Sequence, residues 1–452
     1  MEKNFKNWNY FIQTFGCQMN VHESEKLAGV LKELGMGVSE TQGEADIVVI
    51  NTCAIRESAE KKIESFIGNL KAPKLKGKVK CVVLVGCMTQ QSGKAENIKK
   101  KFPFVDLIIG TMNLSNFKDL FLEWATKNKS KIEILESRTG KDITDIYRTS
   151  GVNAWVNISF GCNNFCTYCI VPYVRGREIS RPMSDIVSEV KTLLGQGYKQ
   201  ITLLGQNVNS YGNDIEDENI TFANLLREID KLDYKFRLRF MTSHPKDLND
   251  DVINAIKNGT HICHSIHLPA QSGSSAILNA MNRKYTREHY IGLVEKIKKE
   301  IPDVGLTTDI IVGFPGETEE DFFDTLSLIK QARYQQIFGF IYSKRKGTVA
   351  EKMQNQVPLP EKKARLTKLI ELERQIASEI SSDYVGSSVE VLIEGTNKNY
   401  LVGTTDQNKN VNIVMPDGKT IDDYLGEFVR VRINSSKLTV LYGEIISNDD
   451  NR

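Results

Sequence analysis

The sequence has no long apolar run and no large excess of charge of either sign. No segment approaches the roughly 18 consecutive apolar residues that a membrane-spanning helix needs, and the first residues, Met1 to Trp8, lack the apolar core of a secretion signal. Only 11 of the 452 residues are proline, and 40% are apolar, which suits a folded chain of two or three domains. The net charge of +2 gives no global reason to expect a polyanion. We expect a cytoplasmic protein with no membrane partner.

Cysteines are scarce, with eight in the chain, but three of them stand close together. Cys162, Cys166 and Cys169 have the spacing C-x3-C-x2-C, with no fourth cysteine nearby. Three thiolates can hold three irons of a [4Fe-4S] cluster and leave the fourth iron open. Structural zinc normally takes four protein ligands, so we favour a cluster over a zinc site or three buried thiols.

Three further cysteines each follow an apolar run in the first 125 residues. The runs cover residues 9–15, 46–50 and 80–85, and the cysteines are Cys17, Cys53 and Cys87. In an open parallel sheet the carboxyl ends of the strands share one edge, so the three thiols should lie close together. We favour a second metal or cluster site here over buried structural cysteines. Cys81, inside the third run, and Cys263 are expected to be core residues.

From about Ala154 onward, strand and helix patterns alternate, which predicts six βα units and a partial, open parallel barrel. The expected strands are 155–160, 200–204, 236–242, 264–268, 306–312 and 336–342. The expected helices are 184–194, 248–257, 287–299 and 319–332, and a charged helix over 361–381 follows the barrel.

The loops after the barrel strands are polar and rich in glycine, as a bound nucleoside cofactor requires. The candidate contacts are Gln206, Asn207, Ser243, His267, Gln271 and Gly313. The segment Gly313-Phe-Pro-Gly316 is also typical of a tight turn. His261, His264 and His267 suggest a metal site, but we favour polar lining of the barrel mouth, because alternate residues of a strand face opposite sides.

Three arginines follow the cysteine loop: Arg175, Arg177 and Arg181. They form either a solvated basic face or a binding site for substrate phosphate, since arginine recognises phosphate well. The tail has short strands over 389–393, 400–402, 411–414, 428–433 and 438–441, which predicts a small antiparallel barrel. Residues 381–452 hold seven Lys or Arg against eleven Asp or Glu, so bulk charge does not predict RNA binding there.

Taken in order, these segments resemble the radical SAM methylthiotransferase family over nearly the whole chain. The resemblance rests on Thr14-Phe-Gly-Cys-Gln-Met-Asn20, Asn51-Thr-Cys-Ala-Ile-Arg56 and Val85-Gly-Cys-Met88, and on a tail similar to a TRAM domain. Within the family, four segments resemble the bacterial MiaB type: Tyr173-Val-Arg-Gly-Arg-Glu178, Phe240-Met-Thr-Ser-His-Pro245, His267-Leu-Pro-Ala-Gln-Ser-Gly273 and Arg283-Lys-Tyr-Thr-Arg287.

The resemblance implies an α/β protein of three domains. They are a methylthiotransferase domain with an open parallel sheet (residues 8–125), a partial (βα)6 radical SAM barrel (148–378) and a TRAM barrel (381–448). It implies two [4Fe-4S] clusters, with an auxiliary one on Cys17, Cys53 and Cys87 and a second on Cys162, Cys166 and Cys169 that anchors S-adenosylmethionine. We expect removal of the tail after about Ser381 to weaken tRNA binding without destroying cleavage of S-adenosylmethionine, because the clusters and the barrel lie upstream.

The implied reaction adds a methylthio group to C2 of N6-isopentenyladenosine at position 37, in the anticodon loop of tRNA. It needs a sulfur source and a reductant such as flavodoxin or ferredoxin. Two alternatives stay open. One is methylthiolation of another substrate, either threonylcarbamoyladenosine in tRNA or an aspartate of a ribosomal protein. The other is a non-catalytic iron-sulfur protein that binds RNA.

Overall fold

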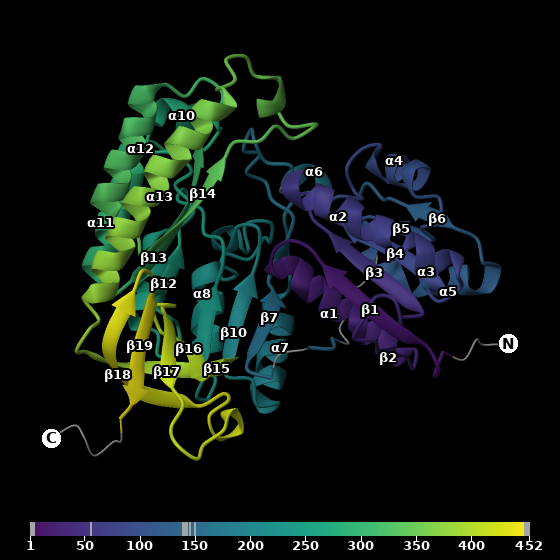
Figure 1. The fold of residues 1–452 in the computed structure, drawn as a ribbon. Coiled ribbons are helices and arrows are strands. Elements are labelled where there is room, and N and C mark those ends of the chain that lie inside the picture. Colours follow the sequence, from purple (N-terminus) through teal and green to yellow (C-terminus); the bar gives the residue numbers. More distant parts are fainter. Residues whose placement is uncertain (1–4, 55–56, 138–142, 144–145, 149–150, 447–452) are drawn as a thin grey trace. The chain divides into compact units, whose positions relative to one another are not determined.

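The computed structural model describes residues 5–446, apart from 55–56, 138–142, 144–145 and 149–150. Parts of the expected segments, among them Ile55, Arg56 and residues 447–448, therefore lie outside the described residues. The chain divides into two compact units (Figure 1). The first unit holds residues 1–149, 160–165 and 169–179, and the second holds 150–159, 166–168 and 180–452. Among the helices that are described, none is long and apolar enough to cross a bilayer.

The first unit is built on a sheet of six parallel strands (Figure 1). The order across the sheet is β2 (Gly37–Val38), β1 (Asn9–Thr14), β3 (Ile47–Thr52), β4 (Cys81–Gly86), β5 (Leu107–Ile109) and β6 (Lys131–Glu133). The helices of this unit are α1 (Gln18–Glu33), α2 (Glu57–Asn69), α3 (Lys71–Leu75), α4 (Lys94–Lys101), α5 (Phe117–Lys127) and α6 (Val171–Arg175). The three strands expected from the sequence are confirmed as β1, β3 and β4 at the centre of this sheet.

Both faces of this sheet are covered, which explains why its central strands are continuously apolar. Along β3, Ile47 and Val49 join one core, together with residues of α1 and α5. Val48 and Ile50 join the core on the opposite face, together with residues of α2 and α4. Cys81 lies in the first of these cores and is fully buried, as predicted.

The second unit contains six parallel strands in two groups of three (Figure 1). One group is β7 (Asn153–Asn157), β10 (Gln200–Leu204) and β11 (Arg237–Phe240), and the other is β12 (Ser265–His267), β13 (Gly305–Val312) and β14 (Gln336–Ile341). An isolated parallel bridge between Leu238 and Ile262 joins the two groups. The division between the units passes through β8 (Ser159–Phe160) and β9 (Ile179–Ser180). All six predicted barrel strands are present.

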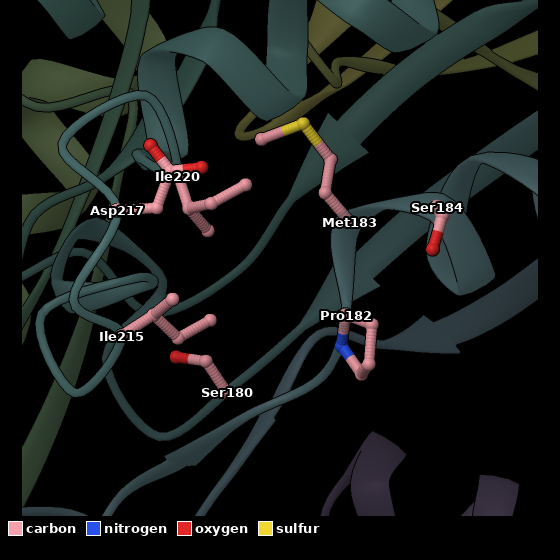
Figure 2. A pocket seen from close by; sticks show the side chains of 7 residues that line it. All are labelled: Ser180, Pro182, Met183, Ser184, Ile215, Asp217 and Ile220. Atoms are coloured by element: carbon pink, nitrogen blue, oxygen red, sulfur yellow. The ribbon is translucent and has the colours of Figure 1, made fainter.

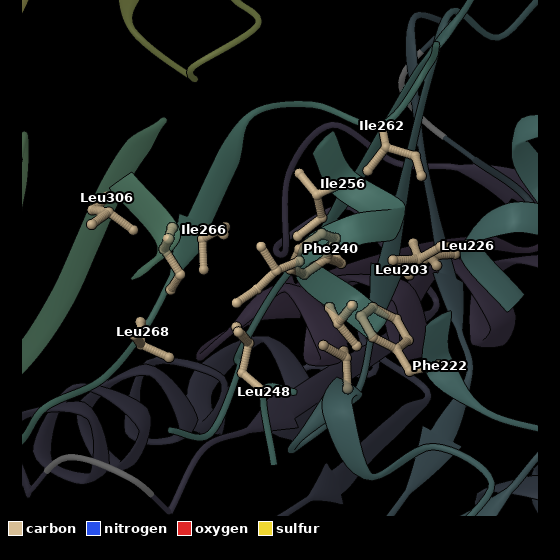
Figure 3. Close-up of a cluster of buried hydrophobic side chains, with 14 of the residues drawn as sticks. Leu203, Phe222, Leu226, Phe240, Leu248, Ile256, Ile262, Ile266, Leu268 and Leu306 are labelled. Atoms are coloured by element: carbon tan, nitrogen blue, oxygen red, sulfur yellow. The ribbon is translucent and has the colours of Figure 1, made fainter. Parts of the chain in front are cut away.

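Helices cover the outside of this partial barrel. They are α7 (Met183–Gly195), α8 (Phe222–Asp230), α9 (Asp250–Asn258), α10 (Ser275–Ala280), α11 (Arg287–Glu300), α12 (Glu319–Ala332) and α13 (Leu359–Ser382). Thr221, Asn249, Ser274, Thr286 and Thr318 each accept a backbone N–H at the start of one of these helices. Figure 3 shows part of the core, where Leu203, Phe222 and Phe240 pack together.

A closed barrel of five strands ends the chain. Its order is β15 (Ser388–Asn397), β16 (Tyr400–Thr405), β17 (Asn410–Val414), β19 (Val440–Ile445) and β18 (Phe428–Lys437). Four of its strand pairs are antiparallel, as predicted, but β17 and β19 run parallel. The expected last strand begins at Leu438, which instead lies in the turn between β18 and β19.

Residues 404–409, here called the basal turn, lie against the amino-terminal ends of the parallel strands. Arg239 donates to the carbonyl of Asp406 over 2.9 Å and to that of Thr405 over 2.6 Å. Arg237 donates to the carbonyls of Thr404 and Glu390. A side chain on Gly305 would place its Cβ 2.4 Å from the carbonyl of Gln407 in the basal turn, so this approach needs a glycine.

Both arginines are buried and the carbonyls of the tail are their acceptors. Removing the tail would take away these acceptors and expose the amino-terminal ends of the strands to water. This packing argues against the expectation that truncation after about Ser381 spares cleavage of S-adenosylmethionine.

Candidate active site

The structure brings Cys17, Cys53 and Cys87 together at the carboxyl edge of the first sheet. Cys17 caps α1 after β1, while Cys53 follows β3 and Cys87 follows β4. Cys53 and Cys87 are buried, and Cys17 is partly exposed. Burial raises the pKa of Cys87 to about 12, and negative charge on Cys17 or Cys53 raises it as well. The predicted convergence of the three thiols is present in the fold.

Glycines and amides hold this edge in shape. Gly86, before Cys87, has a φ of 104°, and a Cβ there would lie 2.5 Å from the carbonyl oxygen of Thr52. The amide of Asn20 donates to the carbonyls of Phe15 and Thr52 over 2.8 and 3.1 Å, which ties the loop after β1 to the end of β3. Sequence reasoning did not single out Asn20 as a site residue, although it ends the Thr14-Phe-Gly-Cys-Gln-Met-Asn20 segment.

Within the described ranges, no three His, Cys, Asp or Glu side chains gather where a single metal ion could bind. A single zinc ion holds its thiolates at about 2.3 Å. A [4Fe-4S] cluster gives each thiolate its own iron, so its ligands stand farther apart. As they stand, the described side chains at this edge therefore form no site for a single zinc ion.

Arg175 lies in the first unit beside this cysteine edge and has 9% of its surface exposed. Its Nε donates to Cys87 Sγ over 3.2 Å, and its Nη1 lies 2.7 Å from Glu23 Oε1. The sequence left two interpretations of Arg175 open, a binding site for substrate phosphate or a solvated basic face. In the structure the guanidinium has acceptors inside the protein, and the alternative of a solvated basic face does not hold for this residue.

The other two arginines differ from Arg175 and from each other. Arg181 pairs with Glu189 over 2.9 Å and donates to the carbonyl of Asn157. Arg177 is exposed, and its guanidinium carbon lies 4.4 Å from the centre of the Phe165 ring. RNA contact remains a prediction for these arginines, and Arg177 is the one on the surface.

The loop that carries Cys162, Cys166 and Cys169 has a strained, closely packed backbone. A Cβ on Gly161 would lie 2.0 Å from the carbonyl oxygen of Arg177, and Phe165 has a φ of 43°. Cys162 and Cys166 are buried and Cys169 is partly exposed. Cys166 Sγ accepts from Arg283 Nη1 over 3.5 Å. The three thiols lie within eight residues of chain, and three thiolates can hold a cluster that has one open iron.

Buried polar atoms without partners gather on the loops at the carboxyl ends of β7, β10 and β11. The atoms, each without a hydrogen bond to the described residues, are Asn157 Nδ2 and Oδ1, Ser159 Oγ, Asn207 Oδ1, Asn209 Nδ2 and Ser243 Oγ. Native proteins pair nearly all buried polar atoms. These atoms therefore fit a polar ligand such as S-adenosylmethionine, which offers hydroxyl, amino and carboxylate groups.

Two of the predicted contacts, Asn207 and Ser243, belong to this group, and three further members were missed. Asn157, Ser159 and Asn209 were not singled out, although Asn157 and Ser159 interrupt an apolar strand at alternate positions. Gly205 leaves room beside them, because a Cβ there would lie 2.9 Å from Ser159 Oγ. Gln206, the neighbouring prediction, is partly exposed in the same loop.

The remaining predicted contacts have partners inside the fold. His267 Nδ1 lies 2.9 Å from Thr307 Oγ1, and the backbone of Gln271 bridges Asp309 and Ile311. The N–H of Gly313 donates to Glu317 Oε2 over 2.7 Å, and Lys362 fills the space that a side chain at 313 would take. The tight-turn interpretation of Gly313 thus has a direct structural reason.

The other histidines and the remaining core cysteine have separate environments. His261 stacks on Phe236 at 4.3 Å between ring centres, and His264 Nδ1 lies 2.7 Å from Asp303. Burial, together with the charges of Arg283 and Lys246, lowers the pKa of His244 to about 2, so this imidazole is neutral. Cys263 is buried, as predicted, and burial raises its pKa to about 12.

A surface cavity of about 430 Å³ lies beside the start of α7. Figure 2 shows Met183 and Ile220 among its lining side chains, which also include Pro182, Ile215 and Asp217. None of the predicted site residues lines this cavity. It is separate from the polar loops described above.

Three known families match the chain in succession. Residues 9–110 match the Uncharacterized protein family UPF0004, residues 156–329 match the Radical SAM superfamily, and residues 382–446 match the TRAM domain. Together with the cysteine loop on a partial parallel barrel, these matches define a radical SAM protein.

Close relatives narrow the class. A tRNA-2-methylthio-N(6)-dimethylallyladenosine synthase of Clostridium botulinum strain Langeland is 51% identical over 441 residues, which cover 97% of each chain. A protein of the same name from Acetivibrio thermocellus is 49% identical over 442 residues, covering 97% of this chain and 91% of its own. The chain belongs to this MiaB-type family of radical SAM methylthiotransferases.

Solved structures share the fold at low identity. The radical S-adenosylmethionine methyltransferase TsrM from Kitasatospora setae has a TM-score of 0.57 and 14% identity, over 76% of this chain and 74% of its own. The cobalamin-dependent radical enzyme OxsB has a TM-score of 0.50 and 13% identity, over 81% and 56% of the two chains. At these identities the likeness concerns the fold alone.

Proposed function

We propose that this protein adds a methylthio group to C2 of N6-isopentenyladenosine at position 37 of tRNA. The observation that carries the proposal is the meeting of Cys17, Cys53 and Cys87 at one sheet edge, in a chain that also has the radical SAM cysteine loop. The relatives that are about half identical over nearly the whole chain bear the name of this activity. Membership of the family and the second cysteine site support the same reaction.

The target carbon is an aromatic position without an acidic proton, so acid-base chemistry alone cannot functionalise it. S-adenosylmethionine bound at a reduced [4Fe-4S] cluster supplies an organic radical, which can act at such a carbon. Cys162, Cys166 and Cys169 are the residues that would hold this cluster. The unpaired atoms of Asn157, Ser159 and Ser243 would bind the polar groups of the cofactor and exclude water from them.

The second cysteine site would hold an auxiliary [4Fe-4S] cluster that provides the sulfur. Iron binding must displace the proton of Cys87, whose pKa is raised by burial. A sulfur source and a reductant such as flavodoxin or ferredoxin complete the reaction. The anticodon loop would present its base unstacked, as RNA-modifying enzymes require, with Arg177 and the TRAM domain as contacts.

Mass spectrometry of tRNA nucleosides tests the substrate. Deleting the gene should abolish methylthiolated isopentenyladenosine and raise its unthiolated form, and the wild-type gene should restore both. A loss of methylthio mass from a ribosomal protein, or from threonylcarbamoyladenosine, with isopentenyladenosine unchanged would overturn the substrate assignment. Unchanged nucleosides and proteins would favour a non-catalytic role.

Iron content tests the two sites. Replacing Cys17, Cys53 and Cys87 with Ala should halve the reconstituted iron and abolish product, while reductive cleavage of S-adenosylmethionine stays measurable. Replacing Cys162, Cys166 and Cys169 should also halve the iron but abolish cleavage. Cys81→Ala is the matched control and should do neither. Full iron in the first triple variant would contradict the auxiliary cluster.

A further inference from the structure

Each of the two cysteine sites has one buried arginine that donates to a cysteine sulfur. In the first unit, Arg175 Nε lies 3.2 Å from Cys87 Sγ. In the second unit, Arg283 Nη1 lies 3.5 Å from Cys166 Sγ. The side chain of Arg175 is 6% exposed and Arg283 as a residue is 4% exposed. Two long charged side chains that are buried this deeply need a structural or functional reason.

The positive charge of Arg175 is neutralised locally. Both of its terminal nitrogens contact Glu23, over 2.7 and 3.3 Å. Its other acceptors are Asn20 Oδ1 at 2.9 Å and Met19 Sδ at 2.9 Å. Glu23 is itself buried. The pair therefore offers Cys87 a hydrogen bond but little net charge.

Arg283 has neutral acceptors instead. Its Nε donates to the hydroxyl of Tyr285 over 2.8 Å and its Nη2 to the carbonyl of Pro269 over 2.9 Å. Among the ion pairs of the described residues, none joins Arg283 to a carboxylate. A buried cation without a counter-charge is costly. A ligating thiolate at Cys166 would supply that counter-charge.

We propose that Arg175 and Arg283 separately tune the reduction potentials of the two clusters. Arg283 raises the potential at the S-adenosylmethionine cluster by facing Cys166 with a positive charge that no carboxylate among the described residues neutralises. Arg175, neutralised by Glu23, acts at the auxiliary cluster mainly through its hydrogen bond to Cys87. Hydrogen bonds to sulfur and nearby charge are the means by which proteins set such potentials. The inference rests on the two clusters of the proposed function.

The two arginines therefore have different effects on the reduction potentials of their clusters. Both are positioning residues, because each acts on its cluster through a cysteine ligand. The cation at Arg283 makes its cluster easier to reduce than the cysteine ligands alone would allow. The Arg175–Glu23 pair keeps the auxiliary cluster from gaining the same advantage. Electrons from the reductant would then be favoured at the cluster that cleaves S-adenosylmethionine.

The test is a redox titration followed by electron paramagnetic resonance on the full-length, reconstituted protein. The potential of each cluster is measured separately, in a variant in which the three cysteines of the other cluster are replaced with Ala. Arg283→Met should lower the ratio of reduced to oxidised S-adenosylmethionine cluster about tenfold at a fixed potential, which equals ~59 mV for one electron. Arg283→Lys keeps the charge and should recover most of this loss.

Substitution of Glu23 provides a matched control at the auxiliary cluster, because it should shift the reduction potential in the opposite direction to substitution of Arg175. Glu23→Gln leaves the Arg175 cation uncompensated and should raise that potential, whereas Arg175→Met leaves a buried carboxylate and should lower it. The double variant should fall between the two, because it loses only the hydrogen bond. None of these three changes should move the other cluster.

The outcomes separate the inference from the proposed function. Four irons in each background with potentials that the variants leave unchanged would overturn the tuning role and leave the two clusters standing. Shifts of the same sign in Glu23→Gln and Arg175→Met would overturn it as well. Absence of iron in the background that keeps only Cys17, Cys53 and Cys87 would overturn the auxiliary cluster, and with it the Arg175 part of the inference.

Discussion

The two ends of the parallel barrel both bury polar side chains, but only those at the amino-terminal end have hydrogen-bond partners within the described protein. At the amino-terminal end, Arg237 and Arg239 are buried and donate to carbonyls of the tail. At the carboxyl end, Asn157, Ser159 and Ser243 are equally buried but keep atoms without partners. A buried polar group costs free energy unless it is paired. The folded protein itself therefore satisfies Arg237 and Arg239 at the first end. The polar atoms at the second end would be satisfied by a bound ligand.

Because of this difference, mutations at the two ends should affect different quantities, the free energy of unfolding at one end and ligand affinity at the other. A change at the paired end removes interactions that the folded chain already has, so it should lower stability. A change in the side chain of Asn157, Ser159 or Ser243 removes no hydrogen bond to the described residues, so it should lower ligand affinity. The following predictions test this separation.

The largest effect should come from removing residues 383–452. Arg237 and Arg239 would lose their acceptors in the tail, and α13 would lose the strands that pack on it. We expect the truncated protein to lose its cooperative unfolding transition and to aggregate, measured by circular dichroism and size-exclusion chromatography. Cleavage of S-adenosylmethionine should be lost as well. A soluble truncated protein with normal cleavage would show that the basal turn does not hold the barrel.

Arg239→Ala should lower the free energy of unfolding by about 3 kcal/mol, because it leaves the carbonyls of Thr405 and Asp406 and the buried Gln200 Oε1 without a charged donor. Urea unfolding measures this loss. Arg430→Ala, on the exposed side of β18, is the control and should change stability by less than about 0.5 kcal/mol. A loss below 1 kcal/mol for Arg239→Ala would mean that the paired end is not distinguished by its hydrogen bonds.

Ser159→Ala should weaken binding of S-adenosylmethionine about tenfold, the value of one lost hydrogen bond of about 1.4 kcal/mol. Stability without the ligand should stay within about 1 kcal/mol, because Ser159 Oγ has no partner to lose. Equilibrium dialysis and urea unfolding give the two values. Gly205→Ala places a methyl group 2.9 Å from the same oxygen and should act in the same direction. If Ser159→Ala lowered the free energy of unfolding as much as the free energy of binding S-adenosylmethionine, the contrast between the two ends of the barrel would be wrong.

An effect of similar size should appear in the pH dependence of stability at Lys409. Burial lowers the pKa of Lys409 from 10.5 to about 8, and its amine donates to Ser381 Oγ over 2.9 Å. The unfolded chain therefore binds more protons than the folded chain between about pH 8 and 10.5, so this residue makes stability rise with pH in that window. Between pH 7 and 9.5 we expect a gain of about 1–2 kcal/mol that Lys409→Met lacks. Identical pH profiles for the two proteins would exclude this role.

Local patterns predicted the elements but not the contacts between distant ones. The strands β3 and β4 are continuously apolar and their cysteine ends share an edge, so both the sheet and the convergence of thiols followed from the sequence. The helix starts were also predictable, since Thr286 and Thr318 lie where capping residues should. Such signals act over a few residues and survive in most folded contexts.

The acceptors of the arginines were not predictable in this way. Arg239 meets Thr405, which lies 166 residues away, and Arg175 meets Glu23, which lies 152 residues away. Phosphate binding was one of two interpretations of Arg175, because this residue follows the cysteine loop in the sequence. Only the fold shows that Glu23 of α1 forms an ion pair with the guanidinium of Arg175. The unpaired atoms of Asn157 were missed for the opposite reason, because a polar residue in an apolar strand is easily counted as strand alone.

The parallel pairing of β17 with β19 has a consequence for synthesis on the ribosome. The small barrel cannot close until residues 440–445 exist, although the basal turn is made more than 30 residues earlier. At roughly 5–20 residues per second, the stretch from the end of α13 to β19 takes on the order of ten seconds. During that interval the arginines at the foot of the larger barrel face water rather than their final partners. The nascent chain at that stage already holds all eight cysteines, while its last domain is still being made.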